Sequence, residues 1–213
     1  MLPPTIPIFP LPNAVLFPNV FLPLHIFEPR YREMVSDALA GDRIIGMVLL
    51  QPGYQANYEG RPAVYPVGCA GVITHSEALP DGRFNIVLRG LEKFHVTGED
   101  ESRAYRLAHV EALPEPTTDD DRAQLRRQRL RLEALLVAAA ERSSGEPRFP
   151  FPSAVSDEDL VNALAQYMAF EPIERQALLE RTSILARCQG LIELLEFKTI
   201  RPHGAPWTGG GVH

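Results

Sequence analysis

The chain has 213 residues, enough for one large domain or two modest ones. Hydrophobic residues make up 45% and charged residues 23% of the chain, as in ordinary soluble globular proteins. This composition excludes a wholly disordered, a collagen-like and a membrane-spanning chain. The formal net charge of −6 disfavours nucleic acid as a partner, because an acidic surface repels phosphate groups.

The two cysteines, Cys69 and Cys188, lie far apart and form neither a C-x-x-C motif nor a disulfide framework. They are most simply interpreted as buried thiols in a reducing compartment. The N-terminus has no positively charged region, and its prolines interrupt any apolar run that could act as a signal peptide. We therefore expect a cytoplasmic protein without a membrane span, a metal or another cofactor.

The N-terminal segment is rich in proline, with eight of the 20 prolines before residue 30. Proline at this density excludes a helix and leaves short extended pieces, here at residues 6–9 and 20–26. Pro29 suits the first turn of a helix, where its missing N–H is not needed. Apolar residues at helical spacing follow, and Gly41 supplies a stop.

The segment from Arg43 to Leu113 has the pattern of β-strands. The residues Leu79-Pro-Asp-Gly82 predict a turn between two of these strands. Gly90 and residues 98–103 are expected to separate the later ones. The expected strands are residues 44–50, 67–76, 83–89, 93–97 and 105–113. Short strands at close spacing, with one inserted helix, favour a small, partly closed barrel.

The second half has helical periodicity and capping signals. A first helix runs from the cap Thr118–Asp121 to about Arg142, and a second opens at Ser156–Asp159. A third starts at Pro172, and Thr182–Ser183 cap the last. These predict a four-helix bundle. We expect a β-rich subdomain (1–115), a helical subdomain (116–200) and a flexible tail (201–213), an α+β protein.

Motifs for catalysis are missing: there is no phosphate-binding loop, no G-x-G-x-x-G and no G-x-S-x-G. His75 and Ser76 are adjacent and, on a strand, would point to opposite faces, which argues against a hydrolytic triad. His95 and His109 could pair across neighbouring strands, but two histidines without a third ligand are poor evidence for a metal. Glu99 and Glu101 are expected in a polar turn.

One basic cluster stands out, and it belongs to the first helix of the second half. Acidic residues flank it, so a solvated helix face with internal ion pairs is the simpler interpretation and an RNA site the alternative. The cluster consists of Arg122, Arg126, Arg127, Arg129 and Arg131.

Aromatic residues in two predicted loops are the remaining candidates for binding. Phe149 and Phe151 fall between two helices, and Tyr54, Tyr58 and Tyr65 between two strands. Such rings either plug the joint between subdomains or form a binding surface. As candidate peptide-binding residues we take Phe149, Phe151, Tyr54 and Tyr58.

Three sequence blocks resemble the N-terminal, substrate-binding domain of Lon proteases. They are the proline-rich opening from Ile6 to Glu28, the β segment from Val67 to Phe94, and the helical segment from Gln176 to Leu195. They follow one another in the order of the family, and the match extends from Ile6 to Phe197. The resemblance implies a PUA-like β pseudo-barrel followed by a helical bundle.

In Lon proteases this region helps to recognise unfolded or tagged substrates, and an ATPase and a serine–lysine protease follow it. Neither is expected here, since the chain stops at His213, so the resemblance implies a stand-alone, non-catalytic form. We therefore expect a module that binds unfolded or extended polypeptide, by strand addition or in apolar pockets, with a separate protease or chaperone as a further partner. A PUA-like RNA-binding protein and a small hydrolase using His75 are the alternatives.

Overall fold

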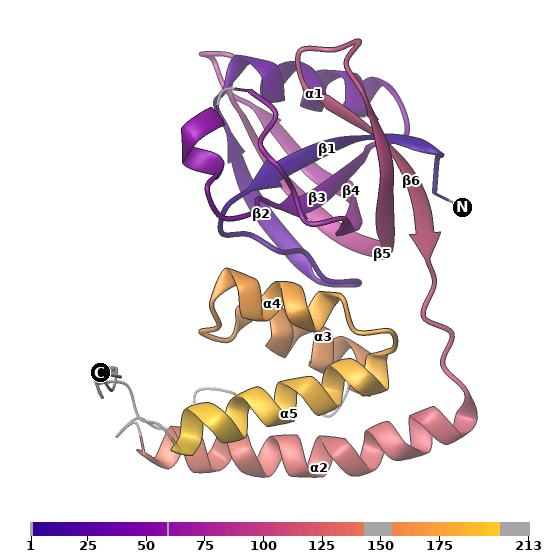
Figure 1. Cartoon of the computed structure of the whole chain (residues 1–213), viewed down its shortest axis with the longest axis vertical. Helices are drawn as coiled ribbons and strands as arrows, with labels where there is room; N and C mark the ends of the chain where they lie inside the picture. Colours follow the sequence, from indigo (N-terminus) through magenta and orange to yellow (C-terminus); the bar gives the residue numbers. More distant parts are fainter. Residues whose placement is uncertain (1, 59, 143–154, 201–213) are drawn as a thin grey trace, which may run out of the picture.

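The computed structural model describes residues 2–58, 60–142 and 155–200, with the strands (the β part) at one end and the helices that follow residue 118 at the other (Figure 1). The strands are β1 (Thr5–Leu11), β2 (Phe21–Ile26), β3 (Ile44–Leu49), β4 (Val67–Ala78), β5 (Phe84–Asp100) and β6 (Arg106–Leu113). The helices are α1 (Pro29–Ala40), the short 3-10 helix η1 (Tyr54–Asn57), α2 (Asp119–Arg142), α3 (Asp157–Tyr167), α4 (Pro172–Leu179) and α5 (Ile184–Ile200). The expected α+β class is confirmed.

The six strands form one mixed sheet in the order β2-β5-β4-β3-β1-β6. Only β1 and β3 are parallel, and β5 also pairs with β6. The pairings of β1, β3, β4, β5 and β6 therefore close into a ring, to which β2 is added along the first half of β5. A small apolar cluster, including Ile8, Phe94 and Ala108, joins residues from β1, β5 and β6.

Several local signals produce the elements that the sequence predicts. Pro29 is the first residue of α1, and Gly41 follows the helix end. The backbone N–H of Asp121 donates to the Thr118 hydroxyl at 3.1 Å, and the Asp121 carboxylate accepts from the Thr118 N–H at 2.9 Å, which completes a capping box before α2. The Ser156 hydroxyl likewise accepts from the N–H of Asp159. Local hydrogen bonding thus fixes these helix ends.

The expected break at Gly90 is wrong, because β5 is one strand of 17 residues that passes through it. A Cβ at position 90 would lie 2.0 Å from the Phe17 carbonyl oxygen, so glycine is needed there for a close backbone approach rather than for a turn. Gly90 also exchanges backbone hydrogen bonds with Asn19 and Val20. The pairing register between β4 and β5 shifts nearby, between Cys69 and Gly71.

The helices of the second half pack on one another, with α5 in contact with α2, α3 and α4. One apolar core runs from the β part into these helices, and its members include Phe17, Leu88, Leu164 and Leu191. The chain therefore buries its two parts against each other. Among the described helices, none is both long and apolar enough to cross a membrane.

Buried polar side chains join the helices to the β part as well. Gln166 of α3 accepts from the N–H of Phe17 at 3.0 Å and donates to the carbonyl of Phe21 at 2.9 Å. Gln176 of α4 donates to the carbonyl of Val67, where β4 begins. Both glutamine side chains thus provide hydrogen bonds to backbone groups at the joint.

Candidate functional site

Tyr54 and Tyr58 lie together in the loop of residues 51–66, between β3 and β4. Their ring centroids are 6.2 Å apart, and the Tyr58 hydroxyl donates to Glu28 Oε1 at 3.1 Å. The Arg30 guanidinium lies 5.7 Å from the Tyr58 ring centroid. Burial raises the pKa of Tyr58, and the negative charge of Glu28 raises it further. The loop thus presents two neighbouring rings, and their part in binding stays a prediction.

The other aromatic candidates have different outcomes. Phe149 and Phe151 lie outside the described residues, so the choice between a plug and a binding surface stays open for them. Tyr65 is partly buried and packs against the main core.

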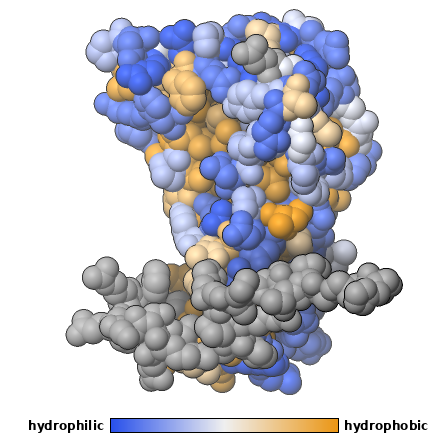
Figure 2. All heavy atoms as spheres, turned by 60° about the vertical axis from the view of Figure 1, so that its left-hand side comes forward, coloured by the Kyte–Doolittle hydropathy of each residue, from blue (hydrophilic) through white to orange (hydrophobic). Residues whose placement is uncertain are grey.

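Figure 2 shows apolar surface exposed on the β part, interspersed with hydrophilic side chains.

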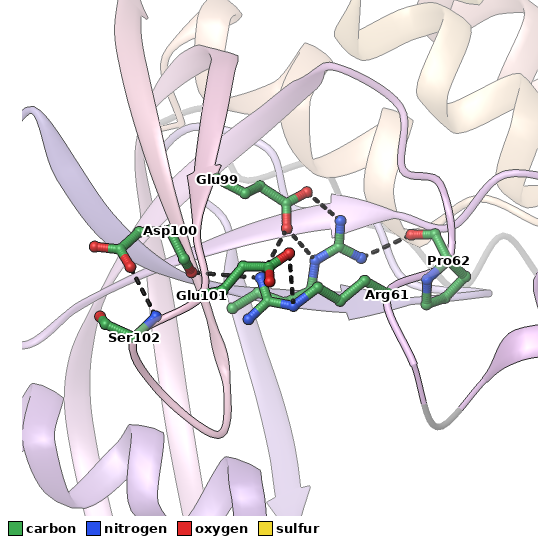
Figure 3. A network of polar contacts seen from close by, with 7 residues as sticks. Arg61, Pro62, Glu99, Asp100, Glu101 and Ser102 are labelled. Carbon is green, nitrogen blue, oxygen red and sulfur yellow. Dashed lines mark hydrogen bonds and ion pairs between the residues drawn. The ribbon is translucent and has the colours of Figure 1, made fainter.

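A polar network holds the second half of the 51–66 loop, at Arg61 and Pro62 (Figure 3). Arg106 is only 7% exposed; it donates through two nitrogens to Glu99 and through Nη1 to the Pro62 carbonyl at 2.7 Å. Arg61 donates to Glu99 at 3.4 Å and to the Asp100 carbonyl at 3.3 Å. Glu99 lies at the end of β5, in this clamp, and not in the free polar turn that the sequence suggests. The network fixes the loop to the β5–β6 hairpin.

The predicted catalytic and metal candidates do not come together. His75 and Ser76 are consecutive residues of β4, opposite Val87 and Ile86, so their side chains point to opposite faces. On β5 the residue opposite His109 is Gly98, and His95 lies opposite Glu111; on β1 the residue opposite His109 is Thr5. Within the described residues, no group of three histidine, cysteine or acidic side chains could hold a metal ion.

The buried thiols predicted from the sequence are confirmed, since Cys69 and Cys188 are both fully buried. Burial raises the pKa of Cys69 to about 12 and that of Cys188 to about 11. At neutral pH both are therefore protonated and poor nucleophiles.

The arginine cluster of α2 is largely engaged within the chain. Arg122 pairs with Asp119, and Arg131 pairs with Glu196 of α5. Arg129 bonds both Glu133 and Asp157, and these carboxylates raise its pKa. The solvated face with internal ion pairs therefore describes Arg122 and Arg131, whereas Arg129, with its side chain 17% exposed, joins α2 to the start of α3.

The end of the sheet at β2 is poorly suited to strand addition. The Phe21 carbonyl accepts from Gln166 and from the Tyr167 hydroxyl, so it points away from β5 and is already occupied. In an antiparallel ladder the outward position recurs every second residue, and the next one is Pro23, which has no N–H to donate. A proline at an edge strand is a common obstacle to pairing with another chain. This edge therefore offers an incoming backbone few partners.

An open apolar groove lies between α4 and α5, on the helical part. Its volume is about 500 Å³, within the range of ligand-binding pockets. Ile173 and Phe197 are 51% and 54% exposed, unusually high for large apolar side chains in a helical pair. The full lining is Ile173, Glu174, Ala177, Leu178, Arg181, Gly190, Glu193, Leu194 and Phe197.

Two ion pairs between the walls mark the ends of this α4–α5 groove. Glu174 pairs with Lys198 at 2.9 Å, and Arg181 pairs loosely with Glu193 at 3.9 Å. Arg181 lies across α5 at Gly190, where a Cβ would come within 3.1 Å of its Nε. The missing side chain of Gly190 therefore makes room for the arginine in the groove.

Local sequence positions both walls. The helix α4 starts at Pro172 with a capping box, in which the side chains of Glu171 and Glu174 bond each other's backbone N–H. Leu178 and Leu179 point into the core, which leaves Ile173 and Ala177 on the outer face. At the start of α5, the Ser183 hydroxyl accepts from the N–H of Ala186 at 3.1 Å. The groove therefore lies on the outer side of a helix pair whose inner side packs into the core.

The helical periodicity of the sequence does not predict this groove, because periodicity alone does not distinguish buried apolar residues from exposed ones. The sequence nevertheless contains a signal. Ile173 and Ala177 are four residues apart and so share a helix face that differs from the face of Leu178, and the segment 191–197 is apolar on more than one face. Such a pattern indicates a helix with a second apolar contact.

Comparisons with known proteins agree with this fold. The family model described as the ATP-dependent protease La (LON) substrate-binding domain matches residues 5–196. Lon protease 1 of Herpetosiphon aurantiacus is 26% identical over 206 residues, which cover 91% of this chain and 24% of that protein. Lon protease 2 of Myxococcus xanthus is 28% identical over 207 residues, covering 92% and 24%. The chain thus spans about a quarter of the length of the curated relatives it matches.

Two solved structures share the fold. The N-terminal domain of the Mycobacterium avium complex Lon protease superposes with a TM-score of 0.66 at 17% identity, over 90% of this chain and 98% of that one. A Lon N-terminal domain protein from Xanthomonas campestris gives a TM-score of 0.59 at 20% identity, over 89% and 97%. On the family match over residues 5–196, the chain belongs to the family of Lon substrate-binding domains.

Proposed function

We propose that this chain is a non-catalytic module that binds polypeptide in the α4–α5 groove. The observation that carries the proposal is the exposure of Ile173 and Phe197 over an apolar hollow of about 500 Å³. An open apolar surface of this kind loses contact with water when another chain covers it, which stabilises the complex. Membership in a family named for substrate binding supports the same function.

The wider setting is part of the proposal. The module acts as an adaptor for unfolded or tagged proteins in the cytoplasm, together with a separate protease or chaperone. The curated relatives are named Lon proteases, which supports a link to proteolysis. The loop rings Tyr54 and Tyr58 are a second candidate contact for the same polypeptide.

The architecture implied by the resemblance also enters as a proposal. The β part is a PUA-like pseudo-barrel, and the helices α2–α5 form a four-helix bundle, with the division near residues 115 and 116. The ring of paired strands supports the former, and the mutual contacts of the four helices support the latter. The core that crosses the division supports a chain in which the two parts fold together.

RNA binding is the weaker candidate function. The ion pairs of Arg122, Arg129 and Arg131 within the chain reduce the positive charge that α2 offers to phosphates. Binding of RNA that weakens steeply as salt rises would favour this alternative, whereas apolar capture of polypeptide depends little on salt.

The test of the proposed function is to fill the groove. Ala177 is an exposed residue of the lining, so Ala177→Arg places a long charged side chain in the hollow without disturbing the core. We expect binding of a fluorescently labelled, reduced and alkylated α-lactalbumin, which stays unfolded, to weaken by at least about tenfold in fluorescence anisotropy.

The matched control is Ala134→Arg, since Ala134 is also an exposed helical alanine but belongs to α2 and not to the groove. This variant should bind the unfolded protein as the parent does. Equal affinity of both variants, or no binding by the parent chain, would contradict the proposed function.

A further inference from the structure

The walls of the α4–α5 groove offer almost nothing to a peptide backbone. The polar side chains in its lining are Glu174, Arg181 and Glu193; each has an ion-pair partner, and among the three Arg181 alone could donate to a backbone carbonyl. An extended segment laid against such walls would leave its N–H and C=O groups without partners, which opposes binding. A helix satisfies its backbone internally and needs only apolar walls.

The dimensions of the groove suit a short stretch of helix. The ion pairs at its two ends involve Glu174 of α4 and Arg181, two residues beyond the end of α4; the separation of seven residues between these positions spans roughly two helical turns or about 10 Å. Two turns present apolar side chains at positions i, i+3 or i+4, and i+7 along one face. The ridge of such a face can pack between Ile173 on one wall and Leu194 on the other.

The charges at the two ends of the groove differ in how firmly they are held. Glu174 pairs with Lys198 at 2.9 Å and also accepts from the backbone N–H of Glu171 at 2.7 Å. The pair of Arg181 and Glu193 is long, at 3.9 Å, and its two side chains are 47% and 57% exposed. An exposed ion pair of this length contributes little to stability, so either side chain can readily pair with another charged group instead. Arg181 is therefore the cation that an incoming carboxylate can engage.

We propose that the groove captures its partner as an amphipathic helix, with apolar side chains at i, i+3 or i+4 and i+7 in the hollow and an acidic residue against Arg181. This inference rests on the proposed function and adds the class of segment that is recognised. It replaces strand addition, which the occupied Phe21 carbonyl and Pro23 oppose at β2. The helix forms as it binds, because so short a stretch is unstable alone in water.

The experiment compares three synthetic peptides of about 16 residues by isothermal titration. The first places leucines at helical spacing and one glutamate at the edge of that face, the second has the same residues in an alternating order, and the third replaces the glutamate by glutamine. We expect the first peptide to bind at least about tenfold more tightly than the second, and circular dichroism to show helix formation on binding. Equal affinity of the first two peptides would overturn the helical inference.

Two protein variants test whether Arg181 engages the acidic residue of the peptide. Arg181→Gln should abolish the preference for the glutamate peptide over the glutamine peptide, which we expect to be about two- to fivefold in the parent chain. Glu193→Gln removes the competing carboxylate and should increase that preference. A preference unchanged in both variants would overturn the role of Arg181.

The outcomes separate the inference from the proposed function. If unfolded α-lactalbumin binds and the helical peptide does not, the inference fails and the proposed function stands. If neither ligand binds, both fail. If the parent chain sediments as a dimer that Ala177→Arg converts to a monomer, the occupant is a second copy, and the inference is wrong.

Discussion

Arg187 is fully buried, and its charge is paired with Glu115 where the helices meet the β part. It donates to both Glu115 oxygens at 2.8 and 2.9 Å, to Asn162 Oδ1 at 2.7 Å and to the Leu178 carbonyl at 3.1 Å. Lys93 pairs with the same carboxylate at 2.9 Å. Burial lowers the pKa of Lys93, and Glu115 opposes that shift. From the sequence Lys93 is only a strand residue, because contacts with residues so distant in the chain leave no local pattern.

Removal of Arg187 should destabilise the fold. In Arg187→Met, Asn162 and the Leu178 carbonyl lose a donor, and Glu115 keeps only Lys93 inside the joint. We expect the free energy of unfolding in urea to fall by about 3 kcal/mol. The control Arg131→Met breaks a surface pair, with side chains 53% and 35% exposed, and should cost less than about 1 kcal/mol. A similar loss in both variants would show that the buried cluster contributes nothing special.

Two tyrosines should make the stability fall at alkaline pH. Burial raises the pKa of Tyr31 to about 12; burial and the hydrogen bond to Asp37 raise that of Tyr105 to about 12. Unfolded tyrosine titrates near pH 10, so this contribution is complete below pH 10 and is lost as the pH rises to 12. Denaturation at several pH values should show that decline, and Tyr105→Phe should reduce it. The same decline in Tyr105→Phe would rule out Tyr105 as a source.

At the scale of elements, the sequence predicts the strands and helices that local chemistry controls. Pro29, the Thr118–Asp121 cap and Ser156 each start a helix where expected. The prediction of a break at Gly90 is wrong, because glycine serves both turns and close backbone approaches, and only the packing of Phe17 distinguishes the two. The sequence places Tyr54, Tyr58 and Tyr65 between two strands, but it does not predict that Glu99 and Arg106 hold this loop, because that contact depends on the pairing of β5 with β6.

Loosening this clamp should affect the loop before the rest of the fold. In Glu99→Gln, Arg106 and Arg61 lose the carboxylate that joins them. We expect amide hydrogen exchange in residues 51–66 to become about tenfold faster, with the exchange of α5 unchanged. The control Glu101→Gln removes the charge of an 81% exposed carboxylate 3.9 Å from Arg61 and should change little. Unchanged exchange in Glu99→Gln would mean that the loop is held by other contacts.

At the scale of the whole molecule, the β part and the helices share one core and a set of buried polar contacts. The order of β and helical segments was predictable, because each has its own periodicity. The groove was not, since hydrophobicity alone does not say which apolar face of a helix remains uncovered. That depends on how α4 and α5 pack against their neighbours, with Leu178 inward and Ile173 outward.

The most direct test of polypeptide binding in the α4–α5 groove is methyl NMR spectroscopy of the whole chain during titration with unfolded α-lactalbumin. The account predicts that the methyl signals of Ile173 and Leu194, in the groove, shift first and furthest. The signal of Leu130, 69% exposed on α2 and outside the groove lining, should stay in place. Shifts confined to α2 or to the β part, with Ile173 and Leu194 unmoved, would contradict the account.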